Sequence, residues 1–330
     1  MIPLSQANQC GSAGTVKGRF APSPSGRMHL GNIFTALMSW LSAKSRGGSW
    51  LLRIEDLDPQ RSRPEYARLI EDDLRWLGLS WDEGGTEGLG FAGPYVQSER
   101  SPLYADALAR LEASGDTFEC FCTRAEIMAT QAPHQPDGRI VYPGTCRNLT
   151  RRPDRKGAIR LKVADEKICF TDMIAGPCSF NLAHECGDFI LRRADGAWAY
   201  QLAVVVDDAA MGVTEVMRGN DLLLSAAQQI WLYRRLGLTP PAFAHIPLIC
   251  NAAGQRLSKR DSSMSMEALR SRFDPEDIIG YLAWISRLIP DPRPCTATGL
   301  IPHFCIDRLS VMPHEIRVDK SIEAFKTLYS

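Results

Sequence analysis

Residues 19–32 (RFAPSPSGRMHLGN) lie between a short candidate strand and a candidate helix. Residues 16–18, which precede this stretch, can form a short strand. Residues 33–41, which follow it, carry apolar side chains at helical spacing. The prolines, the serines and Gly26 between the two disfavour the interior of regular elements and favour a turn. A helix that begins after such a turn presents free N–H groups and a positive dipole end, which favour a bound anion. The segment therefore predicts a strand–turn–helix site for nucleotide phosphates, unless it is only a loop that its prolines stiffen.

Length and composition narrow the classes of protein to which this chain can belong. With 330 residues, it suits two domains or one domain with an insertion. Lys+Arg and Asp+Glu number 38 each, so the net charge is zero and a partner held by bulk electrostatics alone is excluded. The first residues lack a signal-peptide pattern, and there is no run of about 18 apolar residues that would span a membrane. We therefore expect a cytoplasmic protein whose ten cysteines are thiols or metal ligands.

A second strand is predicted over residues 50–56 (WLLRIED), which turn acidic at their carboxyl end. Strand, helix and strand at this spacing form a βαβ unit with parallel strands and a right-handed crossover. Ligands of open α/β sheets bind at the carboxyl ends of the strands. We therefore expect Arg19, Ser23 and Glu55 to lie near one another.

Later segments of the chain are expected to interrupt this sheet and then to extend it. Residues 188–193 and 198–206 are expected to form a hairpin around an Asp-Gly turn, and the apolar run 202–206 predicts a strand buried on both faces. That strand would return the chain to the parallel sheet, so residues 107–195 are expected to be an insertion. Amphipathic patterns predict helices over 64–78, 101–114, 225–236 and 275–289, and apolar runs predict strands over 158–163, 213–222 and 244–249.

Three cysteines occur at spacings typical of a zinc knuckle. Cys120 and Cys122 form a C-x-C pair, and Cys146 follows after a polar loop. Thiolates are preferred ligands of structural zinc. No further Cys or His stands out as the fourth ligand, so Tyr142, as a phenolate, and His134 are the candidates. The alternative is three unconnected thiols, since free cysteine is often simply buried.

Two short motifs together resemble the signature sequences of class I aminoacyl-tRNA synthetases. The residues HLGN at 29–32 match the family's His-Ile-Gly-His pattern, and LSKR at 257–260 match Lys-Met-Ser-Lys-Ser. Asn32 and Arg260 depart from these patterns in the way that the glutamyl branch of the family does. The resemblance runs from about residue 18 to 285. The same branch is indicated, in this order, by residues 19–26, 53–56, 205–208 and 218–222.

The length of the chain narrows the resemblance to one group within that branch. Ordinary glutamyl-tRNA synthetases continue into a helical anticodon-binding domain, whereas this sequence stops at Ser330. It is therefore similar to the glutamyl-Q tRNA(Asp) synthetases. This similarity implies that L-glutamate is activated with ATP, without tRNA, and transferred to the queuosine base at the wobble position of tRNA(Asp). It also implies a Rossmann-like parallel sheet, an inserted zinc-binding α+β subdomain and a short C-terminal helical part. We expect a monomer.

The parts of the chain are assigned on the same basis. We expect a loose leader (1–15), the first half of the catalytic domain (16–106), the inserted subdomain with its zinc knuckle (107–195), the second half of the catalytic domain with the Leu-Ser-Lys-Arg loop (196–260) and a C-terminal helical region without an anticodon-binding domain (261–330).

The resemblance also implies roles for individual residues. An arginine binds a carboxylate as a bidentate fork, and Glu55 can accept from the α-ammonium of glutamate, but which arginine takes the γ-carboxylate stays open. ATP, accompanied by Mg²⁺, would be bound by His29, Gly31, Asn32 and Lys259, of which His29, Asn32 and Lys259 would be catalytic. One structural Zn²⁺ would be held by Cys120, Cys122, Tyr142 and Cys146. Glutamate would lie against Arg19, Phe20, Ala21, Pro22, Ser23, Glu55, Tyr200 and Arg218.

Other functions share parts of this pattern. A shortened glutamyl-tRNA synthetase would charge tRNA(Glu) at its 3′ end and would generally need tRNA to activate glutamate. A catalytically silent tRNA-binding protein would have no need of both His29 and Lys259. A nucleotidyltransferase acting on a small molecule would explain those two motifs but neither the glutamate-binding set nor the zinc insertion.

Overall fold

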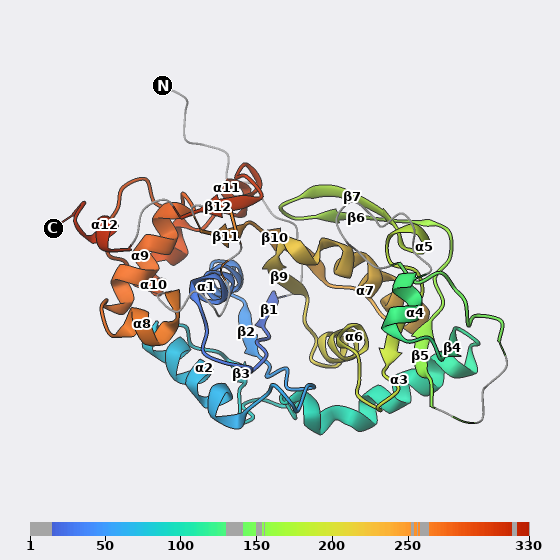
Figure 1. Ribbon diagram of the computed structural model, residues 1–330. Helices are drawn as coiled ribbons and strands as arrows, with labels where there is room; N and C mark the ends of the chain where they lie inside the picture. Colours follow the sequence, from blue (N-terminus) through green and yellow to red (C-terminus); the bar gives the residue numbers. More distant parts are fainter. Residues whose placement is uncertain are drawn as a thin grey trace.

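A parallel sheet and a set of antiparallel strands form two parts of the structure (Figure 1). Residues 1–14 of the expected leader, His134 and Lys259 lie outside the described residues. The structure is a computed structural model, and it describes residues 15–129, 141–149, 154, 156–251, 254, 255, 257, 264–318 and 322–329.

The parallel sheet is built from strands that lie far apart in the sequence. The amide nitrogen of Thr214, just before β9, donates to the carbonyl oxygen of Lys17 at 3.0 Å, so β9 lies beside β1 (Figure 1). The predicted parallel sheet is therefore confirmed. Its first group of strands is β1 (Lys17–Phe20), β2 (Ser49–Leu52) and β3 (Glu83–Gly84), and its second is β9 (Glu215–Gly219) and β10 (Ala242–Ile246).

Helix α1 (Leu30–Lys44) connects β1 to β2 and confirms the predicted βαβ unit. Its buried face includes Ile33 and Leu37, which the helical spacing places on one side. The chain leaves the helix through Gly47, whose φ of +66° costs glycine little. This short return brings β2 directly against β1.

The four other predicted helices form close to their expected bounds. Helix α7 ends at Gly237, which has the left-handed conformation that favours glycine after a helix. Two 3₁₀ turns lead into helices, namely η1 (Gln97–Arg100) and η2 (Asn220–Leu222). The four helices are α2 (Pro64–Trp76), α3 (Ser101–Ala113), α7 (Leu223–Leu236) and α9 (Pro275–Ile285).

The described residues between α3 and β9 include the antiparallel strands and three helices. One sheet has the order β4 (Thr117–Cys120), β5 (Ala158–Leu161) and β8 (Phe189–Arg192). A separate hairpin consists of β6 (Lys167–Asp172) and β7 (Gly176–Asn181), and it lies beside β10 (Figure 1). The helices are α4 (Arg124–Ala129), α5 (Leu182–Glu185) and α6 (Tyr200–Ala210).

Helix α6 corrects one prediction. The run 202–206 is not a strand of the parallel sheet but the middle of this helix, and the expected hairpin is limited to residues 197–199, where Trp198 pairs across the turn with Arg192. Every residue from Leu202 to Asp208 is buried. A helix that is covered on all sides is apolar all round, so its sequence resembles that of a doubly buried strand. Asp207 and Asp208 therefore lie on a helix and not at the end of a strand.

The C-terminal region contributes a strand that the sequence did not predict. The expected strand 244–249 is divided at Pro247, which has no N–H for a ladder. Its second part, β11 (Leu248–Cys250), pairs in parallel with β12 (Glu315–Arg317), so the region expected to be helical also supplies a strand. The other elements are α8 (Met266–Arg270), α10 (Ala297–Leu300), η4 (Ile301–His303), α11 (Ile306–Ser310) and α12 (Ile322–Lys326).

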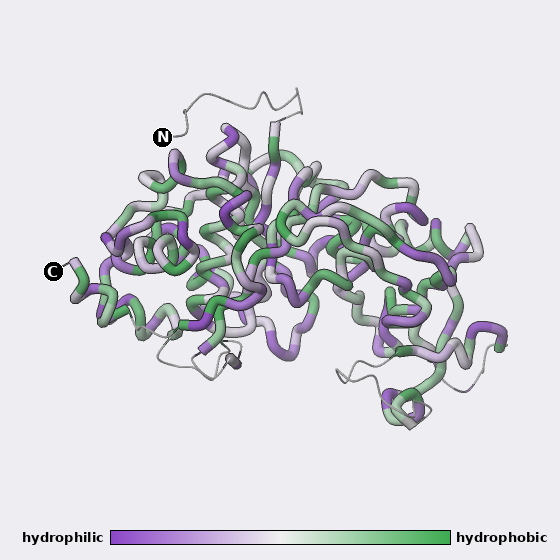
Figure 2. The backbone as a smooth tube through the Cα atoms, turned by 90° about the horizontal axis from the view of Figure 1, so that it is seen from above, coloured by the Kyte–Doolittle hydropathy of each residue, from purple (hydrophilic) through white to green (hydrophobic). Residues whose placement is uncertain are grey.

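Two large hydrophobic clusters hold these elements together. One joins α1, α2 and α9 with the C-terminal helices, and the other joins α3, α6 and α7 with the β6–β7 hairpin. Hydrophobic and hydrophilic segments are interspersed along the backbone (Figure 2). Within the described residues, no helix has both the length and the apolar character needed to cross a bilayer.

Gly84 of β3 offers a test of the packing at the end of β2. A Cβ built on Gly84 (φ +97°) lies 1.9 Å from the carbonyl oxygen of Leu52, whereas one on Gly88 (φ +69°) meets nothing within 4 Å. We expect Gly84→Ala to lower the free energy of unfolding by at least about 3 kcal/mol, because strain and a backbone clash add. Gly88→Ala, the control, costs about 1 kcal/mol through its backbone conformation alone. Urea unfolding measures both, and equal costs would contradict the clash.

Candidate active site

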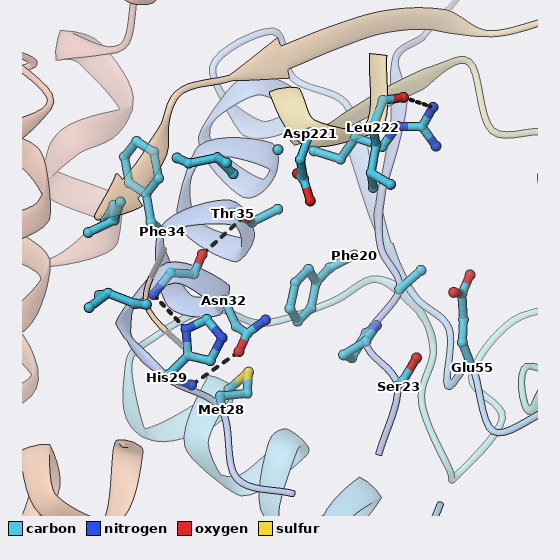
Figure 3. A pocket seen from close by; sticks show the side chains of 18 of the residues that line it. Phe20, Ser23, Met28, His29, Asn32, Phe34, Thr35, Glu55, Asp221 and Leu222 are labelled. Carbon is cyan, nitrogen blue, oxygen red and sulfur yellow. Dashed lines mark hydrogen bonds between the residues drawn. The ribbon is translucent and has the colours of Figure 1, made fainter. Parts of the chain in front are cut away.

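One cavity of about 490 Å³ lies where β1, β9 and the start of α1 meet. It brings together almost the whole predicted site, while Lys259 lies outside the described residues. Figure 3 shows His29 and Asn32 on one side of this cavity and Ser23 and Glu55 on the other, with Phe20 between them. The predicted residues that line it are Arg19, Phe20, Ala21, Pro22, Ser23, His29, Gly31, Asn32, Glu55, Tyr200 and Arg218.

His29 and Asn32 cap the first turn of α1. The amide of Gly31 donates to Nδ1 of His29, and the amide of His29 donates to Oδ1 of Asn32, both at 3.1 Å (Figure 3). A Cβ on Gly31 would come within 3.1 Å of the His29 ring, so a larger residue at this position would press on the ring that forms the cap. The helix N-terminus, with its positive dipole end, thus faces one side of the cavity.

Arg218 is a buried cation that the described part of the chain leaves without a carboxylate partner. Its Nη1 donates to Tyr200 Oη at 3.3 Å and to Gln229 Oε1 at 2.9 Å, and both acceptors are neutral. Burial lowers the pKa of Arg218, yet an arginine stays charged in proteins. The cavity therefore contains an uncompensated positive charge, which favours an anionic ligand.

Arg19 and Glu55 belong to a second buried group of charges. Arg53 donates from Nη1 to Asp208 Oδ1 at 2.6 Å and from Nη2 to Glu55 Oε1 at 3.0 Å. Arg19 uses its Nε for Asp208, at 3.2 Å, and among the described residues its terminal nitrogens have no partner. Those nitrogens remain available to a ligand in the cavity.

The protonation of these carboxyl groups follows from their surroundings. Burial raises the pKa of Glu55, although Arg53 and Arg19 oppose the rise. Burial would raise the pKa of Asp208 as well, but Arg19 and Arg53 hold it below its usual value. A ligand ammonium beside Glu55 would therefore favour its ionised form.

Asp207 extends the buried cluster of charges around Arg53. It accepts from Arg100 Nε at 2.5 Å, from Gln97 Nε2 at 2.8 Å and from Tyr104 Oη at 2.9 Å, and Arg53 Nε lies 3.7 Å away. Sequence reasoning missed these partnerships because they join residues more than a hundred positions apart. The sequence indicated these partnerships only through the two acidic residues that follow the apolar run 202–206. Such residues need partners when they are buried, but the sequence does not identify them.

The three predicted cysteine ligands also come together. The Sγ atoms of Cys120, Cys122 and Cys146 lie within 4.8 Å of one another, and Tyr142 Oη is 3.4 Å from Cys120 Sγ. The amide of Cys146 donates to Tyr142 Oη at 2.8 Å, which fixes the phenol beside the thiols. Three sulfurs and one oxygen at this spacing fit a tetrahedral zinc site. Of the two candidates for the fourth ligand, Tyr142 is beside the cluster and His134 is outside the described residues.

Comparison with known proteins identifies the fold and the family of this chain. A family model described as tRNA synthetases class I (E and Q), catalytic domain, matches residues 15–288. A glutamate tRNA ligase structure from Elizabethkingia meningosepticum superposes with a TM-score of 0.80 at 29% identity, covering 95% of this chain and 68% of that chain. Both comparisons point to the same class of enzyme.

Curated relatives narrow the class. The glutamyl-Q tRNA(Asp) synthetase of Symbiobacterium thermophilum is 51% identical over 91% of this chain and 95% of its own length. The glutamyl-Q tRNA(Asp) synthetase of Nitratidesulfovibrio vulgaris is 49% identical over 87% of this chain and 92% of its own length. Glutamate–tRNA ligase 2 of Alkalilimnicola ehrlichii is 45% identical over 81% of this chain but 58% of its own length. The chain belongs to the glutamyl-Q tRNA(Asp) synthetase family of class I tRNA synthetases.

The buried charges predict a large effect of Asp208→Asn. The substitution leaves Arg53 and Arg19 without their shared carboxylate, which costs about 3–5 kcal/mol in the free energy of unfolding. The control is Asp195→Asn, since Asp195 pairs with Arg193 where both side chains are more than half exposed, and it costs less than about 1 kcal/mol. Urea unfolding of both variants checks this, and a small effect at Asp208 would show that the cluster is not needed for stability.

Proposed function

We propose that this protein activates L-glutamate with ATP, in the absence of tRNA, and transfers the glutamyl group to the queuosine base at the wobble position of tRNA(Asp). The observation that carries the proposal is the division of one cavity into two ends. Arg19, Arg218 and Glu55 lie at one end, and the capped N-terminus of α1 lies at the other. The first set suits an amino acid with two carboxylates, and the second suits phosphates.

Glutamate occupies the end with the charged side chains. Arg218 meets only neutral groups of the described chain, and the terminal nitrogens of Arg19 have no partner there, so each arginine is available to one carboxylate of the substrate. Glu55, held by Arg53, accepts from the α-ammonium. Two cations and one anion complement the charges of glutamate, which explains selection of this amino acid over neutral ones.

ATP occupies the end formed by α1. His29, Gly31 and Asn32 lie at the helix N-terminus, where the dipole stabilises the phosphates, and Mg²⁺ accompanies the nucleotide. A carboxylate oxygen of glutamate attacks the α-phosphorus, and the bond to pyrophosphate breaks. Alignment and charge stabilisation provide most of the acceleration. Lys259, assigned from its motif, stabilises the departing pyrophosphate.

One structural zinc ion completes the proposal. Cys120, Cys122, Tyr142 and Cys146 supply three sulfurs and one oxygen from two segments of the chain. The ion would join these segments and thereby stabilise the end of β4 and the residues around Cys146. It takes no part in the reaction with ATP.

Lys259→Ala tests the activation step. We expect the variant to fold normally but to lose at least about 100-fold in glutamate-dependent ATP–pyrophosphate exchange, because it removes a charge that acts in the transition state. Lys167→Ala, at an exposed position on β6, is the control and retains activity. Exchange by wild-type protein without tRNA distinguishes it from an enzyme that needs tRNA for activation. Near-normal exchange by Lys259→Ala would contradict the assigned role.

The acceptor is tested with tRNA(Asp) that carries queuosine and ends in 2′,3′-dideoxyadenosine. That end has no acceptor hydroxyl, so we expect labelled glutamate to remain on this RNA and to be absent from tRNA(Asp) without queuosine. Labelling of tRNA(Glu) that is lost with the dideoxy end would indicate a shortened glutamate–tRNA ligase instead. Tight tRNA binding with no labelling of any RNA would indicate a catalytically silent binding protein.

Metal analysis tests the zinc site. We expect about one zinc per chain in the wild-type protein and almost none in Cys120→Ser, because a hydroxyl is a poor substitute for a thiolate ligand. Cys305→Ser is the matched control, since Cys305 is exposed and lies outside the cluster. Wild-type protein without zinc would return the three thiols to the simpler interpretation of buried cysteines.

A further inference from the structure

Arg218 is oriented by a histidine that does not line the cavity. Its Nε donates to Nε2 of His245 at 3.1 Å, and His245, on β10, is 2% exposed. An arginine Nε always carries a hydrogen and cannot accept. His245 must therefore present an unprotonated Nε2, which assigns the proton of the neutral ring to Nδ1.

That proton is directed at Asp172. The Nδ1 of His245 lies 2.6 Å from Asp172 Oδ2, and neither side chain has exposed area. The other oxygen of Asp172 accepts from the amides of His245, Ile174 and Ala175 at 2.8–3.1 Å. Burial lowers the pKa of His245, and the pKa of Asp172 is held low by these donors although burial would raise it. An ionised aspartate and a neutral histidine thus form a fixed chain that ends at Arg218.

Asp172 comes from a part of the protein that is remote from the sheet in sequence. It ends β6, and the amide of Met173 next to it donates to the carbonyl oxygen of Phe243 on β10 at 2.8 Å. The guanidinium of Arg218 lies over the Phe243 ring, 5.3 Å from its centroid. The β6–β7 hairpin therefore docks where it can support the side chain that faces the cavity (Figure 1).

We propose that Asp172 and His245 are positioning residues for glutamate: through the Nε of Arg218, they orient its guanidinium so that Nη2 is presented to a substrate carboxylate. The argument rests on the proposed function, since it takes Arg218 to bind glutamate. Tyr200 and Gln229 hold Nη1, and Nη2 has only a long contact, 3.4 Å, to the carbonyl oxygen of Leu222. The hydrogen bond that Arg218 Nε donates to His245, together with the two donated by Nη1, therefore fixes the plane of the guanidinium and leaves Nη2 toward the ligand.

His245→Leu removes the acceptor and tests this role. In glutamate-dependent ATP–pyrophosphate exchange, we expect the KM for glutamate to rise roughly tenfold or more while the KM for ATP stays within about twofold. His245→Gln keeps an acceptor for Arg218 and a donor for Asp172, so it recovers most of the loss. Asp172→Asn weakens the fixed chain and raises the KM for glutamate by a smaller factor. An unchanged KM in Asp172→Asn would remove Asp172 from the proposal.

Two further variants separate positioning from loss of packing. Ile168→Ala loosens the same hairpin from a buried position and leaves Asp172 in place, so the KM for glutamate stays within about twofold. In an Arg218→Lys background there is no Nε–H to orient, so adding His245→Leu raises the KM by less than about threefold. A tenfold rise in Ile168→Ala, or full additivity with Arg218→Lys, would overturn the positioning role.

The outcomes also distinguish this inference from the proposed function. If the wild-type protein shows no glutamate-dependent exchange, or if Arg218→Ala leaves the KM for glutamate unchanged, the glutamate site itself is wrong and the inference fails with it. If both of those results are as expected but His245→Leu and His245→Gln leave the KM for glutamate unchanged, or raise it equally with the KM for ATP, only the positioning role is overturned.

Discussion

Arg53 is the charge on which the assembly of the parallel sheet and helix α6 depends. Its side chain has no exposed area, so carboxylates must lie beside it, because an unpaired buried charge costs several kcal/mol. Asp207 and Asp208 on α6 and Glu55 after β2 meet this need. Strand β2 and helix α6 stand on opposite sides of the antiparallel segment in the chain. The charge cluster therefore joins two distant parts of the sequence and, in doing so, holds Glu55 and Arg19 at the edge of the cavity.

The buried arginines Arg53 and Arg218 differ in whether carboxylates of the protein lie beside them. Burial by itself lowers the pKa of both, but Asp208, Glu55 and Asp207 raise the pKa of Arg53 well above its usual value, whereas burial prevails at Arg218. One charge is neutralised by the fold and is structural. The other is surrounded by neutral acceptors and remains to be neutralised by a ligand. Because the desolvation of Arg218 has already occurred in the folded protein, an arriving carboxylate meets a cation that no carboxylate of the described chain pairs with.

Sequence patterns predicted the elements whose causes are local and failed where burial came from elsewhere. The strand–turn–helix unit around Arg19 to Asn32 and the strand at Trp50 depend on prolines, glycines and apolar spacing, and the structure has both. Their bounds differ from those expected, since β1 extends to Phe20, α1 begins at Leu30 and β2 ends at Leu52 instead of continuing to residue 56. The run 202–206 was wrongly interpreted as a strand because being apolar on every side is common to buried strands and buried helices. The pairing of β11 with β12 was missed because it joins residues far apart along the chain. Sequence patterns indicated little about the role of His245. A single polar ring in an apolar strand needs a hydrogen-bond partner when it is buried, but the sequence does not identify that partner.

The sequence by itself determined the class of protein and the chemically active residues that line the cavity, because the motifs of the family are contiguous and their chemistry follows from residue type. Only the tertiary structure decided how the charges are paired. Arg53, Asp207 and Arg100 are neighbours in space through folding alone, and so are Asp172, His245 and Arg218. Ion pairs and hydrogen bonds form between groups a few ångströms apart, whatever their separation along the chain. Which arginine is neutralised within the protein, and which is left for the substrate, therefore depended on the folded arrangement.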